Sequence, residues 1–200
     1  MHPAPIFRTE DVSLIADHLR HYPLATLTAA LGGSLCVAQT PVLMREIDGR
    51  LVLDFHLSRT NALADYGVSG FEAVAVSLGP EAYISPDWYV SGDQVPTWNY
   101  VSVEAAGPVS LLDNAELIAL LDDLSAQEEA KLTPKSPWTR AKMSPGRFDA
   151  MTRAIVGARL TMTRLEATYK LSQNKAEPDR AGVIAALGDH PIVGAMTAHK

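Results

Sequence analysis

The chain contains 200 residues, of which 47% are hydrophobic and 20% charged, and its formal net charge at pH 7 is −6. This length suffices for one sizeable core, so we expect a single domain over residues 1–200. A single cysteine, Cys36, excludes an internal disulfide and favours a reducing, cytoplasmic environment. We expect neither secretion nor membrane insertion, because the sequence shows no signal-peptide pattern and no apolar run of about 18 residues.

The N-terminal segment predicts one amphipathic helix. Thr9 is expected to cap it, and Pro23 ends it after about Tyr22. Its apolar residues have the spacing of a buried face. They are Val12, Ile15 and Leu19.

The next segment predicts an antiparallel meander. Strands are expected over residues 24–30, 34–43, 50–57 and 73–78. Gly32-Gly33 and Asp48-Gly49 separate the first three strands and are typical of hairpin turns. A fifth strand is expected over residues 100–111, with Gly107-Pro108 as its bulge or exit.

Helical patterns become frequent after residue 111. Asp113 and Glu116 form a capping-box pattern, followed by a stripe of leucines that serves either the core or a subunit contact. The leucines are Leu117, Leu120, Leu121 and Leu124. A proline-rich loop over 133–138 precedes a helix that starts at Ser144-Pro145.

The C-terminal part predicts a strand and a helix. The strand is expected over residues 158–168, although Arg164 breaks its alternation of apolar and polar residues. The helix is expected from Pro178 to Leu187, closed by Gly188. The whole pattern predicts an α+β fold: an antiparallel barrel with helices at its ends.

Aromatic residues are concentrated between Gly79 and Tyr100. Five of the 13 aromatic residues lie there, interleaved with three prolines that place them on turns and strand ends. Such side chains suit a planar ligand, or else form an aromatic corner of the barrel core. The five are Tyr83, Trp88, Tyr89, Trp98 and Tyr100.

A polar segment follows the strand expected over residues 50–57. It gathers hydrogen-bonding side chains around one arginine at what we expect to be a helix start: His56, Ser58, Arg59, Thr60 and Asn61. Main-chain N–H groups and a forked guanidinium favour a terminal phosphate. The alternative is an ordinary helix cap beside an exposed arginine.

These motifs together resemble one family. The stretches GPEAYISPDWY and VPTWNY, with HLSRTN at 56–61 and IVGARLTMTRLEATYKLSQNK at 155–175, are similar to the PaiB-type proteins. These are FMN-binding negative transcriptional regulators with a split β-barrel fold, and residues 3–7 also agree. The chain departs from the family's more usual pattern at Ser58, where alanine is expected.

The resemblance implies an FMN site shared across a homodimer. With the phosphate at Arg59, the flavin ring is expected along the neighbouring strand, beside Gln39, Thr40 and Pro41. His56 is either a proton donor to the reduced flavin or a histidine satisfied by the main chain. Further contributions to the cofactor pocket are expected from Trp98, Asn99, Lys170, Ser172, Gln173 and Asn174, the last four from the partner subunit. A small planar ligand is expected at Tyr83, Trp88, Tyr89 and Tyr100.

Charge is distributed unevenly. Between Lys131 and Lys175 there are ten bases and two acids, which indicates either an anionic partner or a solvated face neutralised by the acidic first half. No helix-turn-helix pattern is visible, which argues against direct DNA binding by this chain. His18 and His21 lack a third ligand of useful spacing, so no metal site is expected.

Two functions therefore remain open at this point. The first is a regulatory flavin-binding module. The second is a flavin-dependent oxidoreductase that acts on a small planar substrate.

Overall fold

The computed structural model describes residues 3–66 and 69–199. Its chain divides into two compact units, which we describe separately. The barrel unit comprises residues 16–77 and 104–165, and the terminal unit comprises the remaining segments, 1–15, 78–103 and 166–200. Three strands contribute residues to both units: β5 (Phe71–Ile84), β6 (Thr97–Leu111) and β8 (Arg164–Lys170). The single-domain expectation stays a prediction.

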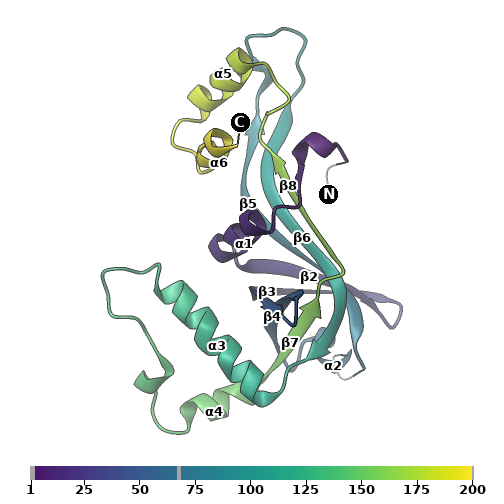
Figure 1. The fold of residues 1–200 in the computed structure, drawn as a ribbon, viewed down its shortest axis with the longest axis vertical. Helices are drawn as coiled ribbons and strands as arrows, with labels where there is room; N and C mark the ends of the chain where they lie inside the picture. The colour runs from purple at the N-terminus through teal and green to yellow at the C-terminus, as the bar shows by residue number, and fades with distance from the viewer. Residues whose placement is uncertain (1–2, 67–68, 200) are drawn as a thin grey trace. The chain divides into compact units, whose positions relative to one another are not determined.

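An antiparallel sheet of eight strands forms the framework (Figure 1). The remaining strands are β1 (Arg8–Thr9), β2 (Leu24–Leu31), β3 (Ser34–Ile47), β4 (Arg50–Ser58) and β7 (Ile155–Thr161). Their order is β1-β8-β6-β5-β2-β3-β4-β7, and an additional pairing of β6 with β7 closes a ring of six strands. The predicted α+β barrel is therefore confirmed.

The helices are mostly those that the sequence predicts. Their bounds are α1 (Val12–His21), α2 (Ala62–Tyr66), α3 (Asn114–Glu129), α4 (Arg147–Thr152), α5 (Glu177–Leu187) and α6 (Ile192–Ala198). Short 3-10 turns span Pro5–Phe7, Pro86–Trp88 and Arg140–Lys142. Helix α6 was not predicted, because it is short and contains Gly194. No helix in the described ranges is long and apolar enough to cross a membrane.

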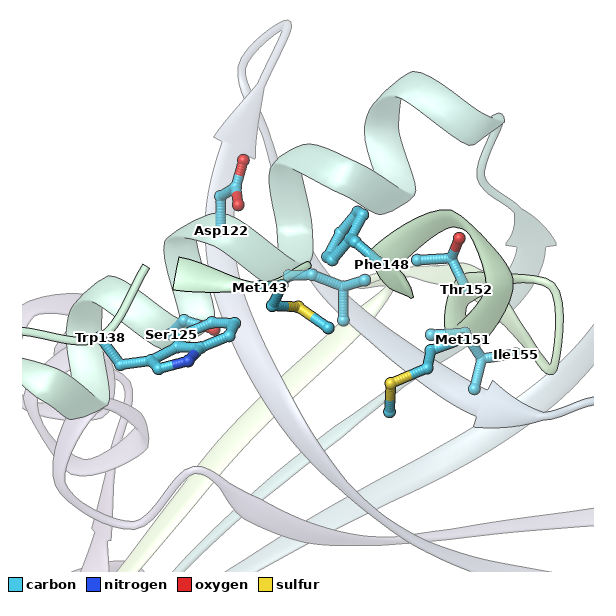
Figure 2. Close-up of a pocket in the computed structure, with 9 residues that line it drawn as sticks. Asp122, Ser125, Trp138, Met143, Phe148, Met151, Thr152 and Ile155 are labelled. Atoms are coloured by element: carbon cyan, nitrogen blue, oxygen red, sulfur yellow. The ribbon is translucent and has the colours of Figure 1, made fainter. Parts of the chain in front are cut away.

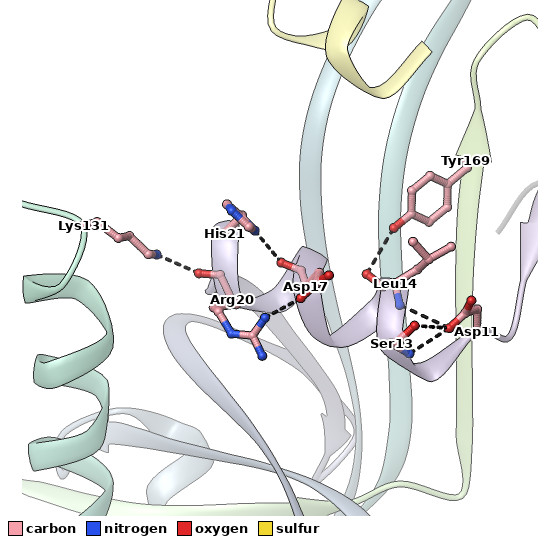
Figure 3. A network of polar contacts seen from close by, with 8 residues as sticks. All are labelled: Asp11, Ser13, Leu14, Asp17, Arg20, His21, Lys131 and Tyr169. Carbon is pink, nitrogen blue, oxygen red and sulfur yellow. Dashed lines mark hydrogen bonds and ion pairs between the residues drawn. The ribbon is translucent and has the colours of Figure 1, made fainter. Parts of the chain in front are cut away.

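Helix α1 starts later than predicted because Asp11, rather than Thr9, caps it. In the terminal unit the Asp11 carboxylate accepts hydrogen bonds from the main-chain N–H of Ser13 at 2.9 Å and of Leu14 at 3.3 Å (Figure 3). Thr9 instead belongs to β1. Val12 is 44% exposed, so it is not part of the buried face that Ile15 and Leu19 form.

At the other end of α1, within the barrel unit, a lysine caps the last turn. Lys131 Nζ donates to the carbonyl oxygen of Arg20 at 2.7 Å (Figure 3). It also pairs with Glu128. Cations suit a helix C-terminus, where carbonyl groups lack partners within the helix. This contact connects α1 to the segment that follows α3.

The strand predicted over residues 158–168 is in fact two strands. β7 ends at Thr161 and β8 begins at Arg164, the residue that breaks the alternation. Between them the main-chain N–H of Thr163 donates to Ala106 at 2.9 Å. A Cβ atom at Gly107 of β6 would lie 1.9 Å from the carbonyl oxygen of Thr161 at the end of β7. The close approach of these two strands therefore requires glycine at this position.

Helix α3 begins with the predicted capping box. Asp113 accepts from the Glu116 main-chain N–H at 2.8 Å, and the Glu116 carboxylate accepts from that of Asp113 at 3.0 Å. Leu117, Leu120 and Leu124 are buried. These three leucines therefore belong to the core rather than to a subunit contact, the two alternatives for the leucine stripe.

Candidate functional site

The turn after β4 contains the candidate phosphate-binding residues. Ser58 Oγ lies 2.8 Å from Thr60 Oγ1 and accepts a hydrogen bond from the main-chain N–H of Thr60 at 3.3 Å. Asn61 Oδ1 accepts from the Leu63 N–H at 2.9 Å and so caps α2. The predicted helix start is confirmed. The hydroxyl groups of Ser58 and Thr60 belong to exposed residues that solutes can reach.

Arg59 is fixed at this turn by the segment before β7. Its main-chain N–H donates to the Ala154 carbonyl at 2.9 Å, and its Nε donates to the Arg153 carbonyl at 2.8 Å. The residue is nonetheless exposed. A guanidinium held through Nε presents its two terminal nitrogens as a fork, the geometry that binds phosphate oxygens in pairs.

Pro41 lies inside β3 rather than at its end. β3 pairs with β2 from Ser34 to Pro41 and with β4 from Val42 to Ile47, so Pro41 is the residue at which β3 changes partners. A proline is tolerated there because it has no N–H to contribute to a continuous ladder. Beside it, Thr40 is buried and its hydroxyl donates to the His56 carbonyl at 2.7 Å, whereas Gln39 is exposed.

Pro41 and His56 line a hollow of about 340 Å³ in the barrel unit. Helix α3 and the loop after it supply the rest of the lining: Leu121, Leu124, Ser125, Glu128, Glu129 and Trp138. His56 Nδ1 is itself buried from solvent and has no hydrogen-bond partner among the described residues. Burial lowers the pKa of His56, so its imidazole is neutral near pH 7.

This hollow fits the flavin ring that the sequence implies. Its mostly apolar lining, with a few polar side chains that include the neutral imidazole of His56, suits a planar heteroaromatic ring. The turn at Ser58–Asn61 lies two residues further along the same chain, where a phosphate group is favoured. The residues suited to the flavin ring and those suited to the phosphate therefore lie at the same end of β4.

The terminal unit contains the second group of predicted residues, and most of them bond to one another. Asn99 Nδ2 donates to Ser172 Oγ at 2.8 Å, and both residues are buried. Lys170 Nζ donates to the Trp98 carbonyl at 2.7 Å. Gln173 accepts from the Leu171 N–H at 2.7 Å, while Asn174 is exposed. These contacts hold the unit together, and a role for the residues in a partner's pocket stays a prediction.

The aromatic residues of the terminal unit are not buried as one corner. Tyr83 and Trp98 are 48% and 52% exposed and pack edge to face, with ring centroids 6.0 Å apart. Tyr89 is buried under Lys175, whose Nζ lies 4.9 Å from the ring centroid. Trp88 and Tyr100 are half-buried. Exposed Tyr83 and Trp98 leave the planar-ligand prediction open.

Pro80 is one of the three prolines expected to place the aromatic residues on turns and strand ends, but β5 continues through it to Ile84. β2 pairs with β5 only as far as Ser77. Beyond that residue the missing N–H of Pro80 interrupts no ladder with β2.

Comparison with known proteins decides the family. A family model described as "Putative FMN-binding domain" matches residues 1–164. The chain belongs to this family. The "Protease synthase and sporulation protein PAI 2" of Bacillus subtilis is 28% identical over 181 residues, which cover 90% of this chain and 86% of that protein. The resemblance to PaiB-type proteins is thus confirmed.

Solved structures share the fold. The flavocytochrome Anf3 of Azotobacter vinelandii has a TM-score of 0.60 at 16% identity, covering 90% of this chain and 78% of its own. The FAD and heme binding protein of Mycobacterium smegmatis has a TM-score of 0.57 at 17% identity, covering 92% and 81%. The chain is a flavin-binding split-barrel protein with FMN as its cofactor.

Two features of this split barrel were missed in the sequence. Trp138 lines the hollow beside His56, although the sequence predicts only a proline-rich loop there. A tryptophan among prolines, as at residues 79–100, is the signal that points to it. Asp54 was also missed: it is buried in an otherwise apolar strand, RLVLDFHL, a position that requires a cation nearby.

Proposed function

We propose that this protein binds FMN as a homodimer, with the phosphate at Ser58, Arg59 and Asn61 and the flavin ring beside Pro41 and His56. The hollow lined by Pro41 and His56, next to the hydrogen-bonding turn at Ser58–Asn61, carries this proposal. Along an extended chain, Arg59 lies roughly 10 Å from His56 at about 3.3 Å per residue. The five-carbon ribityl chain of FMN spans a distance of that order.

The residues of the proposed flavin site have distinct roles. Arg59 binds the phosphate as a fork, and the hydroxyl groups of Ser58 and Thr60 donate to its remaining oxygens. His56, held neutral by burial, borders the ring and can exchange a hydrogen bond or a proton with it. Leu121, Leu124 and Trp138 exclude water from the ring face. When bound, FMN supplies electron-transfer chemistry that no side chain here provides.

The homodimer is supported by an exposed sheet face. Leu24, Leu35 and Val37 are 59%, 79% and 58% exposed. Leu35, Val37, Gln39 and Pro41 alternate along β3, and Leu24 lies opposite Pro41, so all five share one face. Large contiguous apolar surfaces usually mark an interface. Since Pro41 also lines the hollow, a second copy on this face would border the flavin.

The regulatory role proposed here is flavin sensing rather than DNA reading. Five of the ten bases between residues 131 and 175 form ion pairs with acids outside that stretch. They are Lys131, Lys135, Arg140, Arg159 and Arg164, paired with Glu128, Glu129, Asp122, Asp54 and Glu116, and Glu104. Internal pairing reduces the charge available to a polyanion.

A second candidate is a flavin-dependent oxidoreductase for a small planar substrate. The mostly apolar hollow next to His56 favours it, because such a site can exclude water from a reactive ring. His56, Glu128 and Glu129 are the side chains lining it that can transfer a proton.

The proposal is tested by cofactor loading and mass together. Visible absorption of the purified protein before and after adding FMN reports occupancy. Sedimentation at micromolar concentration should give about twice the 21.5 kDa chain mass. Val37→Arg should yield a monomer with weakened FMN binding, whereas Leu132→Arg, on an exposed loop, should change neither. A wild-type monomer with full FMN occupancy contradicts the shared site.

A further inference from the structure

A second hollow of the barrel unit lies between α3, α4 and the loop that joins them, and has a volume of about 280 Å³. Figure 2 shows the side chains of Trp138, Met143, Phe148 and Met151 arranged around it. Asp122 and Ser125 of α3 and Thr152 of α4 supply its few polar groups. This composition, apolar with a small number of polar groups, is that of a small-molecule site.

The loop that forms this hollow is anchored. The Trp138 main-chain N–H donates to a carboxylate oxygen of Glu129 at 2.7 Å, and Lys142 Nζ donates to the Pro137 carbonyl at 2.7 Å. Even so, Trp138 is 38% and Met151 is 54% exposed. The fold therefore holds large apolar side chains partly open to solvent around one cavity, at a cost in free energy that a ligand would recover.

Charges at the rim indicate that the ligand is neutral. The Asp122 carboxylate pairs with Arg140 at 3.3 Å. The guanidinium carbon of Arg140 in turn lies 5.4 Å from the centroid of the Phe148 ring. Both charges are thus already compensated within the protein, and an ionic ligand would have to displace one of them.

We infer that this hollow binds a small, neutral, planar aromatic molecule. Indole and phenyl rings stack on such a ligand, and the thioethers of Met143 and Met151 contact ring edges favourably. The volume limits the ligand to about one or two fused rings. Leu121, Ser125 and Trp138 line both this hollow and the one at Pro41 and His56, so the ligand lies beside the proposed flavin site.

The test uses 2-naphthol, a neutral bicyclic probe, titrated calorimetrically into the flavin-free protein. One molecule should bind per chain. Met151→Gln should weaken binding about tenfold, because it replaces an apolar contact with a polar one. Thr152→Phe should abolish binding by filling the hollow. Leu132→Gln, on the same loop but outside the hollow, is the matched control and should bind like wild type.

FMN titration of the same variants separates this inference from the proposed function. Normal FMN binding by Thr152→Phe shows that the variant is folded, and failure of wild type to bind FMN leaves the naphthol result intact. The inference is overturned if wild type does not bind 2-naphthol, or if Met151→Gln and Thr152→Phe bind it unchanged. It is also overturned if binding appears only after dilution to monomers, since a second copy then fills the hollow.

Discussion

Arg159 holds the buried carboxylate of Asp54 through two parallel hydrogen bonds, from Nε to Oδ1 at 2.7 Å and from a terminal nitrogen to Oδ2 at 2.9 Å. Asp54 is 2% exposed and also contacts Arg45 Nε at 3.1 Å. Arg159 reaches Glu116 at 2.9 Å as well, which ties the first turn of α3 to the barrel. Helix α3 in turn forms one side of both hollows.

Arg159→Met should therefore destabilise the protein. Asp54 would keep only Arg45 as a buried counter-charge, so the free energy of unfolding should fall by about 2–4 kcal/mol. Chemical denaturation measures this. Arg20→Met, which removes an exposed pair with Asp17, should cost less than about 0.5 kcal/mol. Equal effects of the two substitutions would show that the buried pair has no special role.

Gly107→Ala should be similarly damaging for a steric reason. Its Cβ would approach the Thr161 carbonyl oxygen to 1.9 Å, and a main-chain atom cannot move aside as a flexible side chain can. We expect a loss of more than about 2 kcal/mol in unfolding free energy. Gly92→Ala, with no heavy atom within 4 Å of the new Cβ, is the control. A wild-type melting temperature for Gly107→Ala would refute the close crossing of β6 and β7.

His18 predicts a dependence of stability on pH. Burial lowers its pKa to about 4, from 6.5 in an unfolded chain, while its Nε2 lies 3.0 Å from Ser77 Oγ. Between pH 6.5 and about 4, His18 is therefore protonated in the unfolded chain but not in the folded protein. Stability is fully present above pH 6.5 and falls by about 1.4 kcal/mol per unit as the pH drops towards 4.

Urea denaturation between pH 4 and 7 tests this dependence. His18→Gln should be less stable than wild type at pH 7, because the packing changes, yet should lose less stability on acidification. Parallel pH profiles for the two proteins would rule out His18 as the titrating group.

The sequence predicted the local structure better than the exchange of partners between strands. Hairpin turns at Gly32-Gly33 and Asp48-Gly49 follow from local conformational preferences, and all five early strands were found. Pro41 and Arg164 each mark a place where the chain passes from one neighbouring strand to another, and local preferences do not show this exchange. Only the folded sheet determines which strand that neighbour is.

The candidate site likewise has one part that the sequence predicts and another that only the fold brings together. The turn from His56 to Asn61 is contiguous, so its donors could be recognised together. Trp138 lies beside His56 because α3 packs on the barrel, where Arg159 connects Asp54 of β4 to Glu116 of α3. No local pattern contains that information.

Duplex DNA should bind weakly. Ion pairs neutralise half of the bases between residues 131 and 175, and the chain as a whole carries −6. Fluorescence anisotropy of labelled DNA against salt, with and without FMN, measures this. Submicromolar affinity near physiological salt, with a log–log slope of several units, would instead demonstrate multiple phosphate contacts and a direct DNA-binding function.

The most direct test of the account is the binding of FMN and riboflavin to wild type and to Arg59→Ala, followed by flavin fluorescence. Arg59→Ala should weaken FMN binding roughly ten- to hundredfold, because it removes a charge-assisted pair with the phosphate. Riboflavin, which lacks the phosphate, should bind both proteins equally and more weakly than FMN binds wild type. Arg50→Ala, at the other end of β4, is the matched control and should leave FMN affinity unchanged. Unaltered FMN affinity in Arg59→Ala, or riboflavin binding wild type as tightly as FMN does, would contradict the phosphate site.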